Sequence, residues 1–380
     1  MSNFKNFLVV PSSRWQLGLI KYLKKSKYNV FTLDDNLFAE GHKFSDFILN
    51  IKTKNISKIK NFCKHKKLFP ISCSSDFGFK IVNKIQRKQG DFFNKLKQRT
   101  IQKELGLDTP LFFDYKTYNS QNFTKCKKKV ISKPIIGSGS NDVKYHDKFI
   151  LYNDKNILYE EFIKGTEYNI EGLVYNKKIL IFSVMKKKKF KNSKVVSYIL
   201  KKNSLSKKTL NNLNRIIKKF ILRSKYPNGP FHVEVIVQKK TKKIYFVEGH
   251  PREAGFDMFY FTCKMLTGLN LYKIVTDIKL KKKIDINLIE NKKQYTNFCC
   301  RMVPFKREGK LKKIYFKKFK DNKNVKTFVN IFSQKNDVII NKNNDASRMA
   351  YIQSFSNDNK INLEKYTLNI LNRHFVSKFY

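Results

Sequence analysis

Apolar side chains fall at every second position from Phe231 to Val237, which is the period of a strand with one buried face. His232 and Glu234 occupy intervening positions, so they are expected on the opposite face. A second strand-like stretch runs from Ile244 to His250 after a short Lys-rich segment. The pattern predicts a β-hairpin that packs one face against a core and carries polar side chains on the other.

The predicted hairpin places two carboxylates opposite each other. If the turn pairs Gln238 with Ile244, the same register pairs Glu234 with Glu248. Opposed side chains in an antiparallel pair lie about 5 Å apart at Cβ, where like charges destabilise the sheet. We therefore expect a cation between them, and Mg²⁺ commonly takes one or two carboxylates and leaves its other positions to water and phosphates. A solvated hairpin with two ordinary surface glutamates is the alternative.

A Gly/Ser-rich loop follows a short apolar strand in residues 130–143, VISKPIIGSGSNDV. Such a loop lets backbone N–H groups approach phosphate oxygens without interference from Cβ atoms, and Lys133 would add a positive charge. The spacing differs from that of a P-loop, and most Gly/Ser loops are only turns. The segment is a candidate phosphate site, with a plain turn as the alternative.

Three acids lie in the stretch of residues 157–170, ILYEEFIKGTEYNI. They are Glu160, Glu161 and Glu167. Carboxylates are unsuited to binding phosphate, but they accept hydrogen bonds from donors such as an adenine amino group or ribose hydroxyls. Taken singly, each acid is also compatible with an ordinary surface position.

The N-terminal segment has the rhythm of a β-α-β unit. Strands are predicted at residues 7–10 and 30–33, with an amphipathic helix at 15–23 between them. The first turn, residues 11–14, reads PSSR and lacks the glycines that seat a dinucleotide pyrophosphate. Dinucleotide binding is therefore excluded for this segment.

Further elements are predicted in the C-terminal half. A strand at Ile179–Met185 runs into four lysines, Lys186–Lys189, which we interpret either as a solvated turn or as a mobile basic loop over phosphates or an anionic substrate. Helices are predicted at Phe256–Leu271 and Asn362–Phe375. Short strands alternate with polar turns between residues 293 and 350.

The order of these segments resembles that of the ATP-grasp family, whose members join a carboxylate to an amine or another nucleophile through an acyl phosphate. The resemblance covers nearly the whole chain and rests on five motifs in the family's order, none of which is specific alone. The motifs are Asn94-Lys95 before Leu105–Pro110, Lys133 before the loop 137–141, the hinge residues 160–163 with Gly165-Thr166-Glu167, His232-Val233-Glu234, and Glu248 with Arg252 and Gly255.

This resemblance implies a mixed α/β and α+β architecture with the ATP-grasp fold. It implies an N-terminal Rossmann-like pre-ATP-grasp domain in residues 1–90 and an ATP-grasp domain in residues 91–290, whose small nucleotide lid spans about 125–170. A β-rich C-terminal portion, residues 291–380, would complete the ATP-grasp unit.

The resemblance also implies a site for ATP and for Mg²⁺, or Mn²⁺ in its place. Glu234 and Glu248 would hold the metal. Arg252 would contact the transferring phosphoryl group or the substrate carboxylate, with Lys133 as a second catalytic residue. Glu160 is expected near the adenine amino group and Glu167 on the ribose. The implied ATP-binding residues are Lys95, Lys133, Gly137, Ser138, Gly139, Ser140, Glu160, Glu161, Phe162, Ile163 and Glu167. Weaker substrate-site candidates are Ser12, Ser13, Arg14, His232 and His250.

One position departs from the family pattern. Many members carry Asn two residues after the second metal Glu, where this chain has His250, and imidazole suits Mg²⁺ less well than an oxygen ligand. The L-amino-acid ligase and carboxylate-amine ligase branch varies at this position and favours His-x-Glu on the preceding strand, as at His232. That branch is the closer likeness. The two histidines are expected as a hydrogen-bonded structural pair beside the metal.

The expected reaction is the ATP- and Mg²⁺-dependent joining of a small carboxylate, such as an amino acid, to an amine. An acyl phosphate would be the intermediate, and ADP and phosphate would be released. One alternative is an enzyme of the biotin-carboxylase or purine-pathway type that activates bicarbonate or formate. A second alternative is a module that keeps the fold without catalysis and binds a nucleotide or a polyanion. The intact set Lys95, Lys133, Glu234, Glu248 and Arg252 argues against that module.

The formal net charge of +51 raises the question of a nucleic-acid partner. Lysine accounts for 70 of the 80 basic residues and arginine for 10, whereas planar recognition of phosphates or bases favours arginine. The excess is spread along the chain, and Lys, Asn, Ile and Phe are abundant together, as under A/T-rich codon usage. We therefore expect small-molecule carboxylate and amine substrates and no specific nucleic-acid partner.

A chain of 380 residues with 41% hydrophobic residues can bury a sizeable core over two or three domains. No apolar run approaches the roughly 18 residues of a membrane span, and the N-terminus has no signal-peptide pattern, so a cytoplasmic protein without membrane contact is expected. The six cysteines show no Cys-x-x-Cys spacing and are expected to be reduced structural thiols. A homodimer is left open.

Overall fold

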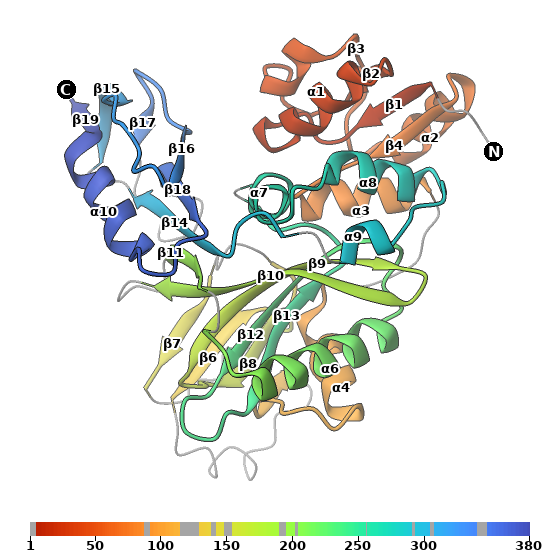
Figure 1. Ribbon diagram of the computed structural model, residues 1–380. Coiled ribbons are helices and arrows are strands. Elements are labelled where there is room, and N and C mark those ends of the chain that lie inside the picture. The colour runs from red at the N-terminus through yellow and green to blue at the C-terminus, as the bar shows by residue number, and fades with distance from the viewer. Residues whose placement is uncertain are drawn as a thin grey trace.

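Figure 1 shows the computed structural model of the protein. It describes residues 5–86, 92–114, 129–137, 142–147, 154–189, 195–201, 204–255, 257–290, 293–304, 308–339 and 348–380.

The N-terminal residues form a parallel sheet with the strand order β3-β2-β1-β4. Its strands are β1 (Asn6–Val9), β2 (Asn29–Thr32), β3 (Phe47–Ile48) and β4 (Leu68–Ile71), and its helices are α1 (Leu17–Lys25), α2 (Ile56–His65) and α3 (Asp76–Ile85). The predicted β-α-β unit is confirmed, with each strand beginning one residue earlier than expected. The helix predicted at residues 15–23 starts as a 3₁₀ turn, Arg14–Gln16, and continues as α1.

An antiparallel sheet forms the centre of the molecule (Figure 1). In the described ranges it has eight strands in the order β13-β12-β9-β10-β11-β14-β18-β16. The strands are β9 (Thr166–Tyr175), β10 (Lys178–Lys189), β11 (Val195–Leu200), β12 (Gly229–Val237), β13 (Ile244–His250), β14 (Asn297–Pro304), β16 (Lys326–Ile331) and β18 (Arg348–Ser356). Because β14, β16 and β18 come from the C-terminal portion, that portion extends the central sheet.

Two smaller sheets accompany the central one. The first, which we call the lid sheet, has the order β5-β8-β6-β7, and the second has the order β17-β15-β19. Their strands are β5 (Phe112–Asp114), β6 (Val130–Pro134), β7 (Lys144–His146), β8 (Ile157–Glu161), β15 (Gly309–Phe316), β17 (Val338–Ile339) and β19 (Phe375–Phe379). The remaining helices are α4 (Lys95–Glu104), α6 (Lys207–Arg223), α7 (Lys264–Thr267), α8 (Leu271–Lys279), α9 (Asn287–Glu290) and α10 (Leu363–His374).

Helix α6 packs on one face of the central sheet, as Figure 1 shows. Its Leu213, Ile217 and Phe220 belong to one buried cluster with Phe231 and Val235 of β12. The predicted alternation along β12 is thereby confirmed, because Phe231, Val233, Val235 and Val237 all belong to this cluster.

The opposite face of the sheet contacts the N-terminal domain. Leu173 of β9 and Leu180 of β10 share a buried cluster with Phe7 of β1, Leu19 of α1 and Leu271 of α8. A continuous apolar layer therefore holds the N-terminal parallel sheet against the central sheet.

The β12–β13 hairpin contains a β-bulge. Glu234 faces Glu248, as predicted, but the register shifts beyond this pair. Val237 pairs with Ile244, so the predicted pairing of Gln238 with Ile244 is wrong. An extra residue on β13 before Glu248 absorbs the difference, which is what a bulge does to an antiparallel ladder.

Two other predictions are wrong in part. The helix predicted at residues 256–271 is instead a π-helix, Met258–Cys263, followed by α7. Gly268 then takes a left-handed φ of +74° at the helix C-cap, a conformation that ends helices. Lys186–Lys189 form neither a turn nor a loop, because they continue β10 and pair with β11.

The C-terminal helix and the unbridged cysteines agree with the prediction. The helix expected at residues 362–375 is α10. Cys63, Cys73, Cys263, Cys299 and Cys300 are buried and unbridged, while the sixth cysteine, at position 126, lies outside the described residues. None of the helices in the described ranges is long and apolar enough to cross a membrane. The domain boundaries at residues 90 and 290 stay predictions.

The packing of α6 generates a stability prediction. Phe220 is fully buried and its ring centroid lies 4.0 Å from that of Phe246. We expect Phe220→Ala to lower the free energy of unfolding by about 3–5 kcal/mol, because a buried aromatic ring is replaced by a cavity. Urea denaturation measures the change. The control is Leu222→Ala in the same helix, which is 39% exposed and should cost much less. Equal losses in both variants would contradict this packing.

Candidate nucleotide and metal site

A cleft of about 620 Å³ is lined by both the lid sheet and the central sheet. Predicted site residues that line it are Lys95, Lys133, Gly137, Glu160, Glu161, Phe162, Ile163, Glu167, Glu234 and Glu248. The fold therefore gathers residues from α4, β6, β8, β9, β12 and β13 around one space. The predicted loop residues Ser138, Gly139 and Ser140 lie outside the described residues.

Lys133 and Glu160 form an ion pair on the lid sheet. Lys133 pairs with Leu158 in the β6–β8 ladder, so Glu160 is its diagonal neighbour on the same face. The Lys133 Nζ lies 2.7 Å from Glu160 Oε2. Burial lowers the pKa of Lys133 to about 8, although Glu160 opposes that shift.

Arg99 contacts both oxygens of the same carboxylate. Its Nε donates to Glu160 Oε1 at 2.7 Å and its Nη2 to Oε2 at 3.1 Å, a two-pronged contact that fixes the plane of the carboxylate. The Nη2 also donates to the Val247 carbonyl at 2.9 Å. Although burial alone would raise the pKa of Glu160, Arg99 and Lys133 lower it. Arg99 was not predicted from the sequence, because nothing in α4 distinguishes it from an ordinary helix residue.

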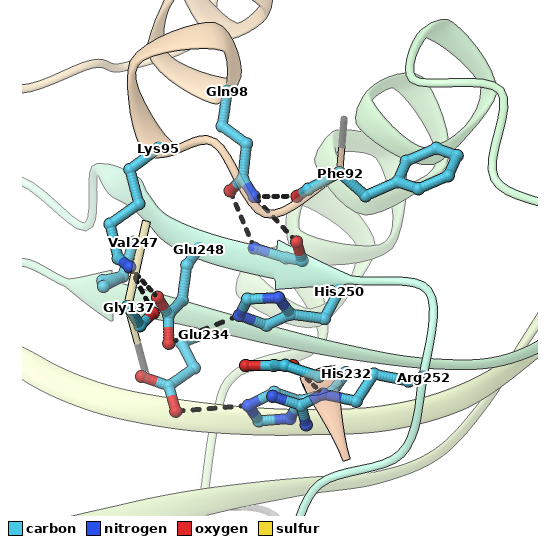
Figure 2. Close-up of polar contacts among 12 residues, drawn as sticks. Phe92, Lys95, Gln98, Gly137, His232, Glu234, Val247, Glu248, His250 and Arg252 are labelled. Carbon is cyan, nitrogen blue, oxygen red and sulfur yellow. Dashed lines mark hydrogen bonds and ion pairs between the residues drawn. The ribbon is translucent and has the colours of Figure 1, made fainter. Parts of the chain in front are cut away.

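Lys95 stands at the start of α4, where the Asn94 side chain caps the helix by accepting from the Lys97 N–H at 3.0 Å. Figure 2 shows its side chain pointing toward the hairpin. The Lys95 Nζ donates to the Gly137 carbonyl at 2.7 Å and lies 3.6 Å from Glu248 Oε2. Lys95 therefore connects the start of the predicted phosphate loop with the predicted metal carboxylate.

Glu167, the acid predicted to bind ribose, is paired with two lysines of β10. Lys187 Nζ donates to Glu167 Oε1 at 2.9 Å, and Lys189 Nζ lies 2.5 Å from Oε2. Lys187 also donates to Glu234 Oε1. The buried position of Lys187 was missed because it lies inside a run of four lysines that the sequence pattern placed in a turn or loop.

Glu234 and Glu248 are cross-strand neighbours, and both line the cleft (Figure 2). Each contacts a lysine from another element and the histidine two residues away on its own strand. Glu234 contacts Lys187 and, at 3.2 Å, His232 Nε2. Burial alone would raise the pKa of Glu234, but Lys187 and His232 lower it. For Glu248, Lys95 and His250 outweigh burial and hold the pKa well below its usual range.

The two histidine rings stack in parallel, with ring centroids 6.1 Å apart. The hydrogen bonds of His232 go to Glu171 and Glu234, and the predicted role of the two histidines as a structural pair stays a prediction. His232 Nδ1 lies 2.7 Å from Glu171 Oε1, and this fully buried acid also accepts from Asn169 and from the Ala254 N–H. Burial alone would lower the pKa of His232, but Glu171 and Glu234 raise it to about 9. Burial lowers the pKa of His250. His232 therefore connects the buried Glu171 with Glu234.

Gln98 fixes the edge of the hairpin to α4 (Figure 2). Its Nε2 donates to the Gly249 carbonyl at 2.8 Å and its Oε1 accepts from the Gly249 N–H at 2.9 Å. A second donation from Nε2 reaches the Phe92 carbonyl at 2.7 Å. β13 is the edge strand of the central sheet, so no further strand pairs with its outer side. The Gln98 side chain makes the two hydrogen bonds to the Gly249 backbone that a neighbouring strand would otherwise make.

Arg252 connects the hairpin with the N-terminal domain. Its guanidinium is paired with Asp76 at the start of α3 and donates to the Glu253 carbonyl at 2.6 Å. Burial alone would lower the pKa of Arg252, but Asp76 raises it. The buried Glu253 in turn accepts from the Ser74 N–H at 3.0 Å and from the Tyr260 hydroxyl. Sequence patterns gave no sign of these long-range partners.

The weaker substrate candidates of the first loop do not line this cleft. Arg14 Nη2 lies 2.7 Å from Glu40 Oε1, and Arg14 also donates to the Phe332 carbonyl. Ser13 and Arg14 line a separate hollow with Asp34 and Glu40, whereas Ser12 is fully buried. A substrate role for these three residues stays a prediction.

Glu234 and Glu248 fit a hard divalent cation. Among the residues that the structure describes, no group of three or more His, Cys, Asp or Glu side chains could hold a metal. A cation at the hairpin would therefore rely on two carboxylates, with water or phosphate oxygens in its other positions. That donor set is the usual one for Mg²⁺.

Comparison with known proteins shows which proteins this chain is similar to. Residues 139–259 match the family model described as the ATP-grasp domain. Over this range the chain is similar to ATP-grasp domains. A comparison with curated protein sequences gives no significant match.

Solved structures extend the likeness over nearly the whole chain. Phosphoribosylglycinamide synthetase from Anaerococcus prevotii is 18% identical, with 99% of each chain covered and a TM-score of 0.77. L-amino acid ligase from Bacillus licheniformis is 16% identical, with 99% of this chain and 98% of that chain covered and a TM-score of 0.77. The biotin carboxylase domain of 2-oxoglutarate carboxylase from Hydrogenobacter thermophilus is 12% identical, with 98% of this chain and 91% of that chain covered and a TM-score of 0.73. These likenesses confirm the predicted ATP-grasp fold.

The paired cations on Glu160 generate a prediction about the lid. Arg99→Met leaves Lys133 as the remaining cation on a buried carboxylate, so we expect the free energy of unfolding to fall by about 3–5 kcal/mol in urea denaturation. Arg99→Met combined with Glu160→Gln should cost less than the sum of the single changes, because each single change already breaks the Arg99–Glu160 contact. As a control, Arg223→Met breaks an exposed pair with Glu104 and should cost less than about 1 kcal/mol. Strict additivity in the double variant would contradict the coupling.

Proposed function

We propose that this protein is an ATP- and Mg²⁺-dependent ligase that joins a small carboxylate to an amine. The observation that carries the proposal is the cleft itself. Opposed carboxylates, Glu234 and Glu248, lie in the same cavity as Lys95 and Lys133 within an ATP-grasp fold. Two acids for a cation and two lysines for phosphates are the parts that binding a metal nucleotide requires.

The hinge between the lid sheet and β9 would bind the nucleoside. Glu161, Phe162, Ile163 and Glu167 line the cleft beside Lys133. Phe162 and Ile163 offer apolar surface to an adenine ring, and Glu167 offers an acceptor to ribose hydroxyls. The carboxylate of Glu160 is already engaged by Arg99 and Lys133, so its contribution to this proposal is to position the Lys133 ammonium.

Lys95 and Lys133 would neutralise the polyphosphate. Both side chains are buried at the cleft wall, where a positive charge acts in a medium less polar than water. When bound, Mg²⁺ would supply further positive charge to the phosphate oxygens. Glu234 and Glu248 would hold that ion, while His232 and Gln98 keep the two carboxylates and the hairpin edge in place.

The reaction would proceed in two steps. A carboxylate oxygen of the first substrate attacks the γ-phosphorus of ATP, which breaks the bond to the β–γ bridging oxygen and gives an acyl phosphate and ADP. The amine nitrogen of the second substrate then attacks the acyl carbon, phosphate leaves, and the amine loses a proton. Arg252, oriented by Asp76, would stabilise the charge on the transferring phosphoryl group or the substrate carboxylate.

The test is an assay of phosphate release with ATP, Mg²⁺ and pools of small carboxylates and amines, with and without bicarbonate. Release that needs both a carboxylate and an amine supports the ligase, whereas release driven by bicarbonate or formate alone supports the alternative activation. Activity should persist near ~0.15 M salt without nucleic acid, because diffuse surface charge is largely screened there. Hydrolysis that appears only with added RNA or DNA and vanishes with salt would contradict a small-molecule substrate.

The opposed carboxylates generate a catalytic prediction. Glu248→Gln keeps the size of the side chain but removes a charge, so we expect turnover to fall by about two to three orders of magnitude at saturating Mg²⁺. Steady-state kinetics measure the change, and circular dichroism checks the fold. Glu104→Gln serves as the control, because Glu104 is exposed and pairs with Arg223 outside the cleft. Wild-type turnover in Glu248→Gln would remove Glu248 from the proposed metal site.

The position of Lys133 generates a binding prediction. Lys133→Ala should weaken ATP binding by roughly 1.5–3 kcal/mol, the scale of a charge-assisted hydrogen bond, and leave adenosine binding nearly unchanged. Calorimetric titration with both ligands makes the comparison. If both affinities fell alike, Lys133 would act through the lid structure instead of through phosphate.

A further inference from the structure

Lys187 is a buried cation in the middle of the predicted ATP and metal site. Its side chain is 5% exposed, and its ammonium contacts Glu167 Oε1 at 2.9 Å and Glu234 Oε1. One ammonium thus bridges the acid proposed for ribose and one of the two acids proposed for the metal. The neighbouring Lys188 points elsewhere, because it pairs with Glu364 of α10.

The two metal acids are held unequally. Glu248 lies 3.6 Å from Lys95 and 3.5 Å from His250, whereas Lys187 is in direct hydrogen-bond contact with Glu234. The internal cations therefore neutralise the opposed carboxylates in the metal-free protein. A divalent cation that reaches the hairpin finds the Oε1 of Glu234 already occupied by a positive charge.

An ammonium and a divalent cation repel each other strongly at contact distance, so they cannot share this oxygen. If Lys187 leaves Glu234, it needs another anion, because a buried ammonium without a partner is costly. The polyphosphate of the proposed nucleotide is the anion that the same cleft would offer. Glu167 and Glu234 would each keep another basic partner when Lys187 leaves. Lys189 still contacts Glu167, and His232 still contacts Glu234.

We propose that Lys187 is the resident counter-ion of Glu234 and that it transfers from this carboxylate to the nucleotide polyphosphate when a divalent cation binds. This inference rests on the proposed nucleotide and metal roles of the cleft. Metal binding thereby depends on the nucleotide, because in the free protein the Lys187 ammonium occupies the Glu234 oxygen that the metal would bind. Lys187 is a positioning residue for Glu234 in the free protein and a phosphate ligand in the loaded one.

The test measures metal and nucleotide binding separately, without turnover. Titration of the nucleotide-free protein with Mn²⁺, followed by the electron paramagnetic resonance of the unbound ion, gives the metal affinity. Calorimetry with ADP in the presence of a chelator gives the metal-free nucleotide affinity. Lys187→Met should bind Mn²⁺ roughly ten- to a hundredfold more tightly and metal-free ADP roughly tenfold or more weakly, the scale set by one charge-assisted hydrogen bond.

Two further variants make the outcome specific. Glu234→Gln releases Lys187 from its partner, so metal-free ADP should bind more tightly although Mn²⁺ binds more weakly. Lys188→Met is the matched control, with the same chemical change on the adjacent residue, and it should alter neither affinity. Lys187→Met and Glu234→Gln should change each affinity in opposite directions. A general loss of structure would instead weaken the binding of both Mn²⁺ and ADP. Glu234→Gln also keeps the proposal open to refutation if Lys187→Met fails to fold.

Mn²⁺ affinity that is unchanged or weaker in a folded Lys187→Met protein would overturn the proposal. So would ADP affinity in Glu234→Gln that does not rise. Failure of the proposed ligase activity gives a different result. In that case no carboxylate and amine pair supports phosphate release, while the binding changes at Lys187 still appear.

Discussion

Two like charges, Glu234 and Glu248, face each other across the β12–β13 hairpin, and the surrounding structure compensates for their repulsion. Each carboxylate has a lysine and a histidine beside it. Burial would raise the pKa of both groups, but these basic neighbours keep the pKa values low. Both carboxylates are therefore already ionised in the ligand-free protein. A ligand that binds there replaces one charged partner of a carboxylate by another.

This balance depends on elements that are distant in the sequence. Helix α4 supplies Lys95 to Glu248 and Arg99 to the lid acid Glu160, and Gln98 of the same helix fixes the hairpin edge. Asp76 of the N-terminal domain orients Arg252. The apolar layer between the N-terminal sheet and the central sheet therefore has a functional consequence, because it sets where these charges can meet.

Local patterns predicted much of this arrangement. The alternation along β12 placed Glu234 on the cleft side, and the opposition to Glu248 followed from the return strand even though the bulge was not foreseen. Lys133 was found because it lies on a short strand before a Gly/Ser loop. Lys187 was misplaced, because a run of four lysines reads as exposed and a strand that continues through it leaves no local signal.

The sequence by itself determined the strands, the hairpin and the identities of the opposed acids, since these depend on neighbours within a few positions and on side-chain periodicity. Tertiary structure alone decided which cations neutralise them. Lys187 and Glu234 are 47 positions apart, Arg99 and Glu160 are 61 apart, and Arg252 and Asp76 are 176 apart. With 80 basic residues in the chain, charge by itself distinguishes none of them. Burial makes the distinction, because an ammonium or guanidinium removed from water must lie beside a carboxylate, and only the folded chain shows which pairs are removed from water together.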